Sequence, residues 1–373
     1  MKVDERAGGE GFPEGFVELP AAVYRDDPCW IPEDPAGVRA AFSSANPFFE
    51  AGGTRLFSVP GEARAAATFD PALRIEGEPV AFFGYFESRG APASDAALFQ
   101  RVEAWARERG ARSLYGPINF NTALAYRLRL SAEPGALPFL GEPYNPPDYP
   151  ARLEAQGYAL NQRYLTQVLP VPAVQAALET QRPALDALLA EGYRMAPFDT
   201  DLWLARIGDF HALAHSIFRE NFAYRPMSPE AFASLAGRPL LRKICAESSI
   251  VCFAPDGAVA GYALAYPHWG PLVVQAAGAD RVALGDLDYA RHIDALRRKP
   301  PVGAIGKTIG LHPDHRGRGL FQAMLLAGWD RSQSRYDLWY AALIREDNSS
   351  RRAFEFFQTA ERWYGLYRKP LGP

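Results

Sequence analysis

Cysteine is scarce in this chain of 373 residues, and no apolar stretch is long. The three cysteines, Cys29, Cys245 and Cys252, are far apart and match neither a metal site nor a disulfide framework. They are predicted to be buried, reduced thiols. No run reaches the roughly 18–20 apolar residues that a membrane span needs. The polar, acidic start MKVDERAGGEGF does not look like a signal peptide. We therefore expect a cytoplasmic protein that does not cross a membrane.

Histidine and excess positive charge are also lacking. Of six histidines, only His211 and His215 share helical spacing, and no third ligand is nearby, so no metal is expected. A net charge of -3 argues against a broad basic surface and makes a nucleic-acid partner unlikely to be the main ligand. With 48% hydrophobic and 22% charged residues, the composition is that of a globular protein, and the length suits two domains.

The most informative segment runs from Lys307 to Phe321 and reads KTIGLHPDHRGRGLF. An apolar, strand-like run ends at Leu311, a basic glycine-rich loop follows, and FQAMLLAGWDRSQ then has helical character. The free N–H groups of a helix N-terminus can hold an anion, and glycines let the backbone approach it closely. This arrangement would suit a diphosphate.

Three interpretations of the loop compete. A dinucleotide-binding fingerprint needs a third glycine, but Gly319 is followed by LFQA. A P-loop needs Gly-Lys followed by Ser or Thr, which is missing. An ordinary strand-to-helix turn with solvated arginines remains the plain alternative.

The loop resembles motif A of the GNAT superfamily of N-acetyltransferases, Gln/Arg-x-x-Gly-x-Gly/Ala. The resemblance implies that acetyl-CoA or another acyl-CoA is the co-substrate and that the loop wraps its pyrophosphate. The residues concerned are Arg316, Gly317, Arg318, Gly319, Leu320 and Phe321. Phe321 departs from the motif, which has Gly or Ala there.

The sequence that follows also fits this superfamily. A strand is predicted at Tyr336–Leu343, and the helix after it resembles motif B from Asn348 onward, shifted by two residues. Asn348, Arg351 and Phe357 are the cofactor-binding candidates of this segment. Phe357 fills the slot of a tyrosine that often protonates the leaving thiolate, and phenylalanine cannot donate a proton.

The chain divides into two halves of similar plan. Residues 162–373 are predicted to open with helices and a hairpin at 249–254 and 259–266, before the motif A strand. The first half repeats the plan with strands at 80–87 and 113–118 and helices at 96–109 and 148–156, but without a glycine loop. An unrelated α/β domain is the alternative for this half.

The whole chain resembles a bacterial family of tandem GNAT proteins of about this length. The predicted fold is α/β (α+β), with two GNAT-like domains, each a mixed, mostly antiparallel sheet flanked by helices. Residues 1–161 would be a degenerate domain, and residues 162–373 would carry the acyl-CoA site. The segments that carry the resemblance are YRDDPCWIP, NPFF, FFGYFE, GPINF, YNPPDY and NFAYRP.

The resemblance implies that an amine attacks the thioester directly while a backbone N–H of the motif A strand stabilises the oxyanion. By position, that donor would be Ile309, Gly310 or Leu311. His312 and Glu346 are candidate bases, although the first could be an exposed loop residue and the second part of a helix cap. Tyr340 and Tyr364 are candidate acids in place of Phe357.

The acceptor is expected between the halves and is predicted to be a small-molecule amine, with an amino acid as one option because arginine suits a carboxylate. The candidate substrate-binding residues follow predicted strands and helices at that junction. They are Asn119, Asn121, Tyr126, Arg127, Tyr149, Asn221, Tyr224, Arg225 and His268. The plain alternative is that these side chains only join the domains.

The leading functional hypothesis is an acyl-CoA-dependent N-acyltransferase, with acetyl as the first choice of acyl group. One alternative is a Fem-type aminoacyltransferase that uses aminoacyl-tRNA. The arginine-glycine loop and the acidic net charge argue against it. The other alternative is a non-catalytic CoA-binding protein, which the phenylalanine at position 357 suggests.

Overall fold

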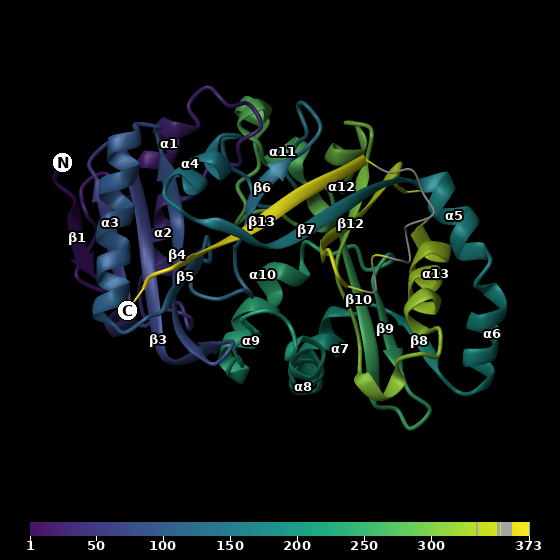
Figure 1. Cartoon of the computed structure of the whole chain (residues 1–373). Helices are drawn as coiled ribbons and strands as arrows, with labels where there is room; N and C mark the ends of the chain where they lie inside the picture. The colour runs from purple at the N-terminus through teal and green to yellow at the C-terminus, as the bar shows by residue number, and fades with distance from the viewer. Residues whose placement is uncertain (333–334, 349–350, 352–359, 373) are drawn as a thin grey trace.

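The computed structural model describes residues 1–332, 335–348, 351 and 360–372, and Phe357 of the predicted cofactor site lies outside them. A single mixed sheet joins thirteen strands of the described chain in the order β1-β2-β3-β4-β5-β13-β7-β12-β11-β10-β9-β8, with β6 paired to β13 (Figure 1). The strands are β1 Asp4–Ala7, β2 Thr54–Val59, β3 Ala63–Ile75, β4 Glu78–Ser88, β5 Ser113–Gly116, β6 Leu128–Ser131, β7 Ala159–Pro170, β8 Arg194–Pro197, β9 Ile250–Phe253, β10 Val259–Pro267, β11 Gly303–Leu311, β12 Leu338–Arg345 and β13 Ala360–Pro370.

Helices cover both faces of this sheet (Figure 1). They are α1 Leu19–Val23, α2 Pro35–Ala41, α3 Pro92–Glu108, α4 Tyr149–Ala155, α5 Val171–Glu179, α6 Arg182–Ala190, α7 Thr200–Ala205, α8 Ile207–Phe218, α9 Pro229–Leu235, α10 Arg238–Leu241, α11 Gly270–Val273, α12 Tyr289–Arg297 and α13 Leu320–Ser332.

Strand β9 shows how the sequence sets the layers. Its four residues are all buried, as expected for a strand covered on both faces. Ile250 and Cys252 pack into the cluster that contains α13, whereas Val251 and Phe253 pack into the cluster that contains α8. Because side chains alternate along a strand, α13 and α8 lie on opposite faces of the sheet. The expected α/β fold, a mixed sheet flanked by helices, is confirmed.

The two halves exchange strands at the centre of the sheet. Strand β7 follows α4 of the first half but pairs with β12 of the second, while β13, at the end of the chain, pairs with β5 of the first half. The two exchanged strands also pair with each other over most of their length (Figure 1). The predicted boundary between residues 161 and 162 falls inside β7, and the division into two domains stays a prediction.

The sequence predicts three helices in the second half, at 174–192, at 203–224 and a shorter one at 230–240, and each is split in two. The predicted helix at 174–192 divides between α5 and α6, where Pro183 stands in the first turn of α6. The stretch 203–224 divides at Arg206 between α7 and α8 and ends at Phe218. The helix at 230–240 divides at Gly237, which is followed by an arginine and a proline that start α10. Apolar periodicity alone did not reveal these breaks because it continues across them.

Candidate active site

The site begins where β11 and β12 part. These parallel strands pair from Gly303 and Leu338 to Gly306 and Ala341, and no pairing continues beyond that point although both strands run on. Between their diverging ends lies a cleft of about 400 Å³. Its walls come from both halves of the chain. Ligands often bind at such junctions.

The equivalent gap in the first half is closed. Strands β4 and β5 pair from Val80 to Phe82 and then diverge in the same way. There the Asn119 side chain accepts a hydrogen bond from the backbone N–H of Tyr85 at 2.8 Å, and the N–H of Ile118 donates to the Phe83 carbonyl at 2.7 Å. The predicted acceptor residue Asn119 therefore seals its own half and does not line the large cleft.

Arg127 forms part of the cleft wall contributed by the first half. Its guanidinium lies between two aromatic rings, 3.6 Å from the centre of the Tyr126 ring and 3.8 Å from that of Tyr164. It donates a hydrogen bond to the Tyr126 hydroxyl, and its Nε is buried without a partner among the described residues. Only 9% of Arg127 is exposed. Burial lowers its pKa to about 10, with a smaller opposing effect from Tyr164.

Lys307 faces the same cleft and is held there by an irregularity of β11. On β10, Leu264 pairs with Thr308 and its neighbour Ala265 pairs with Gly306, so Lys307 is an extra residue between them. Such a bulge turns a side chain away from the normal alternation. A Cβ atom at Gly141 would lie 2.6 Å from the Lys307 Nζ, so the glycine makes room for the ammonium.

The side chain of Lys307 is flanked by protein but is open to the cleft. Its side chain has exposed surface, but that surface belongs to the cleft wall, with protein on every other side. Burial lowers the pKa of Lys307 to about 8, the neighbouring charge of Arg127 lowers it further, and Glu142 opposes them.

The described lining of the cleft contains cations but no carboxylate. Arg127, Lys307 and Arg345 all contribute, whereas the carboxylate that acts on Lys307, Glu142, is fully buried beneath. Glu142 is held by Arg362 at 2.9 Å and by the Tyr364 hydroxyl at 2.6 Å. The cleft therefore presents a positive field to whatever enters it.

One side of the cleft is strongly apolar. Helices α7, α8 and α9 and strand β10 supply a wall that we call the apolar arm. It is lined by Trp203, Phe218, Met227, Phe232, Leu235 and Tyr262. The same cavity includes Gly306–Ile309 at the parting of the strands, so the arm and the gap are continuous.

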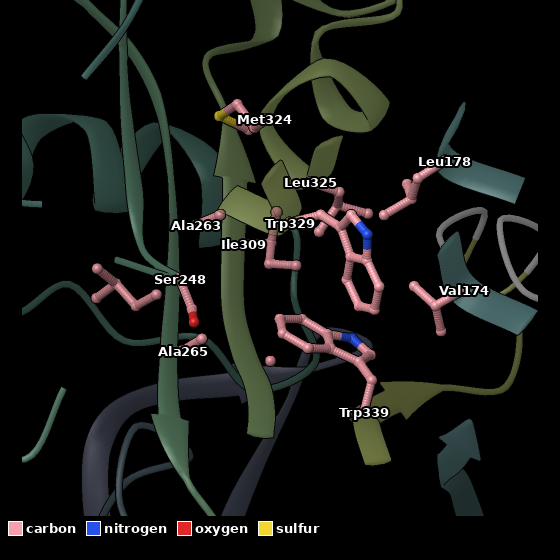
Figure 2. Close-up of a pocket in the computed structure, with 12 residues that line it drawn as sticks. Val174, Leu178, Ser248, Ala263, Ala265, Ile309, Met324, Leu325, Trp329 and Trp339 are labelled. Atoms are coloured by element: carbon pink, nitrogen blue, oxygen red, sulfur yellow. The ribbon is translucent and has the colours of Figure 1, made fainter. Parts of the chain in front are cut away.

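Tryptophan rings fill the opposite face of the gap, toward α13. Trp339 of β12 lies against the backbone of Gly306, where a Cβ atom would be 2.6 Å from its Cζ2. Figure 2 shows Trp339 next to Trp329 of α13, with Ile309 of β11 pointing toward both rings. The remaining hollow measures about 20 Å³, room for about one water molecule. Trp339 lines both this hollow and the large cleft.

The glycine loop leads from β11 into α13, as predicted. Gly317 and Gly319 have φ of 76° and 79°, a backbone region that disfavours other residues, and no atom comes within 3.9 Å of where their Cβ atoms would be. Arg318 pairs with Glu191 at 3.3 Å, while the exposed side chain of Arg316 makes no hydrogen bond or ion pair within the described chain. The N-terminal N–H groups of α13 and a free guanidinium thus meet at an open loop.

The register of β11 narrows the choice of oxyanion donor. The N–H of His312 donates a hydrogen bond to the carbonyl of Ala260 in β10 at 2.8 Å. Since backbone groups alternate along a strand, the N–H of Gly310 points the same way, and those of Ile309 and Leu311 point toward the gap left by β12. A Cβ atom at Gly310 would lie 2.5 Å from Ile217, so this glycine allows α8 to pack closely on the strand.

The four predicted catalytic side chains are not brought together. His312 is outside the cleft, where its Nδ1 accepts from the backbone N–H of Asp314 at 3.3 Å. Glu346 pairs with Arg163 at 3.1 Å beside a separate surface hollow. Tyr340 and Tyr364 are buried on β12 and β13, the first under Arg362 and the second against Glu142. None of these four residues lines the cleft, and their catalytic roles stay predictions.

Of the predicted cofactor residues, Ile309, Phe321 and Asn348 line the cleft. Arg351 lies 5.9 Å from the centre of the Trp363 ring. Leu320 is fully buried and anchors the start of α13.

Five of the predicted acceptor residues line the cleft together. They are Asn121, Tyr126, Arg127, Asn221 and Tyr224. The others lie elsewhere. Tyr149 is buried and donates to Glu87, Arg225 pairs with Asp70 at 2.6 Å, and His268 is buried beside Phe139 and Tyr340. Burial lowers the pKa of His268 to about 4, so this side chain is neutral.

Lys307 is the site residue that sequence analysis missed. In the sequence it is the residue with which the segment KTIGLHPDHRGRGLF begins, and no motif marks it. The signal was available, because a lone lysine inside the apolar run GAIGKTIGL is unusual for a buried strand and needs a reason.

The described residues contain no group of three His, Cys, Asp or Glu side chains that could hold a metal ion. Among the helices in that same part of the chain, none has both the length and the apolar character to cross a bilayer.

Comparison with known proteins places the fold. No family model matches the chain. Protein YghO of Escherichia coli (strain K12) is 28% identical over 159 residues, which are 39% of this chain and 38% of that protein. A tandem GNAT protein from the clavulanic acid biosynthesis pathway superposes with a TM-score of 0.51 and 15% identity, covering 100% of this chain and 99% of that one.

A second structure supports the same fold. It is a conserved protein of unknown function from Enterococcus faecalis V583, named a probable N-acyltransferase, with a TM-score of 0.51 and 9% identity over 100% of this chain and 73% of that one. The chain therefore has a GNAT fold. At these identities the likeness establishes the fold alone.

Proposed function

We propose that the protein is an acyl-CoA-dependent N-acyltransferase that acts on the amine of a small molecule. The observation that carries the proposal is the continuity of β11. One strand both parts from its neighbour to open the cleft and runs directly into the glycine loop at the start of α13. A thioester at the gap and a diphosphate at the loop would then lie on a single structural element, which suits an acyl-CoA.

The gap supplies the electrostatic part of the reaction. The N–H of Ile309 would donate to the thioester oxygen as it gains negative charge, and the positive field of Arg127 and Lys307 would add to that stabilisation. A fixed donor that needs no rearrangement is worth more than the same group in water, because its dipole is already oriented.

The cationic cleft also prepares the nucleophile. An ammonium that enters it meets like charges, which favour loss of its proton. Neutral Lys307 Nζ would take that proton and release it to solvent, and the amine nitrogen would bond to the carbonyl carbon. As the carbon–sulfur bond breaks, the nitrogen would lose its second proton to Nζ, which would pass it to the departing thiolate, so that an amide and a free thiol result.

Calorimetry with CoA and acetyl-CoA tests the proposal, together with thiol release over a panel of amines. Gly319→Asp places a negative charge at the cradle and should abolish CoA binding. Gly61→Asp is the matched control, since Gly61 has a similar φ of 73° at an exposed turn of the first half. Failure of the intact protein to bind CoA would overturn the proposal.

A further inference from the structure

The apolar arm is larger and more hydrophobic than the transfer of a short acyl group requires. Trp203 and Tyr262 form a floor that is almost fully buried, and Phe218, Met227, Phe232 and Leu235 close over it from α8, α9 and the segment between them. The half-buried part of this wall, at Phe218, Met227 and Leu235, is apolar surface that a ligand would bury. A two-carbon acetyl group would occupy only a small part of the cleft of about 400 Å³.

The charged groups of the cleft come from other elements than this wall. Arg127 and Tyr126 come from the first half, and Lys307 stands at the parting of the strands, whereas the arm is built from α7, α8, α9 and β10 of the second half. The cleft is therefore amphipathic, with its reactive centre between a charged region and an apolar one. A ligand with a polar reactive end and a hydrocarbon chain matches this division.

We infer that the apolar arm binds a long hydrocarbon chain carried by one of the two reactants. The inference rests on the proposed function and narrows its substrate class. The hydrocarbon chain could belong to the acyl part of the thioester or to the amine, because the same cavity reaches Gly306–Ile309, where the two reactants would meet. In either case the product is an amide that carries a long aliphatic chain.

Two series of ligands test the inference and separate its sources. Calorimetry with acyl-CoA thioesters of increasing chain length probes the acyl source, and the same measurement with n-alkylamines probes the amine source, all below their micelle concentrations. Affinity in one series should rise by about fourfold per methylene until the arm is full, and then level off. A rise in the first series assigns the chain to the acyl group, and a rise in the second assigns it to the amine.

Ala236→Phe should shorten the chain length at which affinity levels off, because Ala236 lines the cleft and its carbonyl accepts from Trp203 Nε1 at 3.1 Å. Ala233→Phe is the matched control, with the same change on an exposed position of α9, and should leave the profile unchanged. Leu235→Asn is a second variant, at a half-buried position of the wall, and should reduce the gain in affinity per methylene. It replaces Ala236→Phe if that variant does not fold.

The two proposals fail differently. Affinity that does not depend on chain length in either series overturns the inference, and if CoA still binds, the proposed function stands. Loss of all CoA binding overturns the proposed function. The alkylamine series then tests by itself whether the apolar arm binds a hydrocarbon chain.

Discussion

The Arg127 guanidinium stacks 3.8 Å from the centre of the Tyr164 ring, which joins the first half of the chain to strand β7. This stacking holds a nearly buried cation at the cleft without a carboxylate to neutralise it in the described structure. Aromatic faces attract a guanidinium through their quadrupole and leave its charge in place. The cleft thus keeps a positive potential that an ion pair would have cancelled.

Arg127→Met should raise the pKa of Lys307, because the neighbouring guanidinium is one of the charges that lower it. The pKa can be followed by NMR of the protein after reductive methylation with labelled formaldehyde. Arg129→Met is the matched control. Arg129 stacks on Tyr144 at 4.2 Å and should leave the titration of Lys307 unchanged. A Lys307 pKa that is the same in the wild type and Arg127→Met would contradict the account of the cleft field.

Lys307→Met should remove the pH dependence of acyl transfer near neutrality. In the wild type, thiol release should rise as pH increases through about 8, where Lys307 loses its proton. The variant should lose this rise and about 10²–10⁴-fold in rate, typical of general acid–base groups. Lys307→Arg should not restore it, since arginine stays protonated. CoA affinity serves as the folding control, and a variant that keeps the wild-type pH profile would exclude Lys307 as the base.

Arg316→Ala should weaken CoA binding more than Arg318→Ala. Arg316 is exposed and makes no ion pair in the described chain, whereas Arg318 is already engaged by Glu191. Loss of a charge-assisted hydrogen bond of about 1.5–3 kcal/mol corresponds to roughly 10–100-fold in affinity. Calorimetry at two salt concentrations checks this, since a phosphate contact should weaken with salt. Equal losses in the two variants would contradict the assignment.

Glu87→Gln should remove a loss of stability that the wild type shows as pH rises from about 4.5 to about 7. Burial raises the pKa of Glu87 to about 7, and its oxygens accept from Tyr149 at 2.7 Å and Tyr24 at 3.3 Å. Since the folded pKa exceeds the unfolded value, the protonated form favours folding, and this contribution is lost as pH rises through about 7.

The melting temperature of the wild type relative to Glu87→Gln should therefore fall between about pH 5 and pH 8.5. Glu78→Gln, at an exposed position on the same strand, is the control and should show no such trend relative to the wild type. A constant difference between the wild type and Glu87→Gln would mean that Glu87 does not change protonation in this range.

Leu366→Ala in β13 should destabilise both halves together. Leu366 is fully buried in a cluster that includes Tyr115 of the first half and Phe222 of the second. Such a truncation costs about 2–5 kcal/mol. Hydrogen exchange should show reduced protection in both β3 and β10, whereas Leu160→Ala, at an exposed position of β7, should have little effect. Loss of protection confined to one half would contradict the coupling.

The strands and the glycine loop could be predicted from the sequence because local patterns determine them. The apolar run ending at Leu311 and the glycines at 317 and 319 need no knowledge of distant residues. The pairing partners could not be predicted in this way. The sequence 360–370 reads as a strand wherever it lies, and only the tertiary structure places it beside β5.

Part of the cleft could also be predicted from local patterns in the sequence. Its position between the halves, and lining residues such as Tyr126 and Arg127, followed from their place after predicted strands. The role of Lys307 depends on a bulge, which one extra residue creates and no local pattern reveals. Glu346 was expected near the reaction because it precedes motif B, but an ion pair with Arg163 of β7 holds it at another surface.

The central position of β13 also constrains the order of events during protein synthesis. As the ribosome makes the chain from its N-terminus, β5 emerges early, but its neighbour in the sheet is made only with residues 360–370. Until then the first half has an unpaired sheet edge, a surface prone to wrong association. Completion of the first half must therefore wait until residues 360–370 have been made, so the two halves cannot mature one at a time.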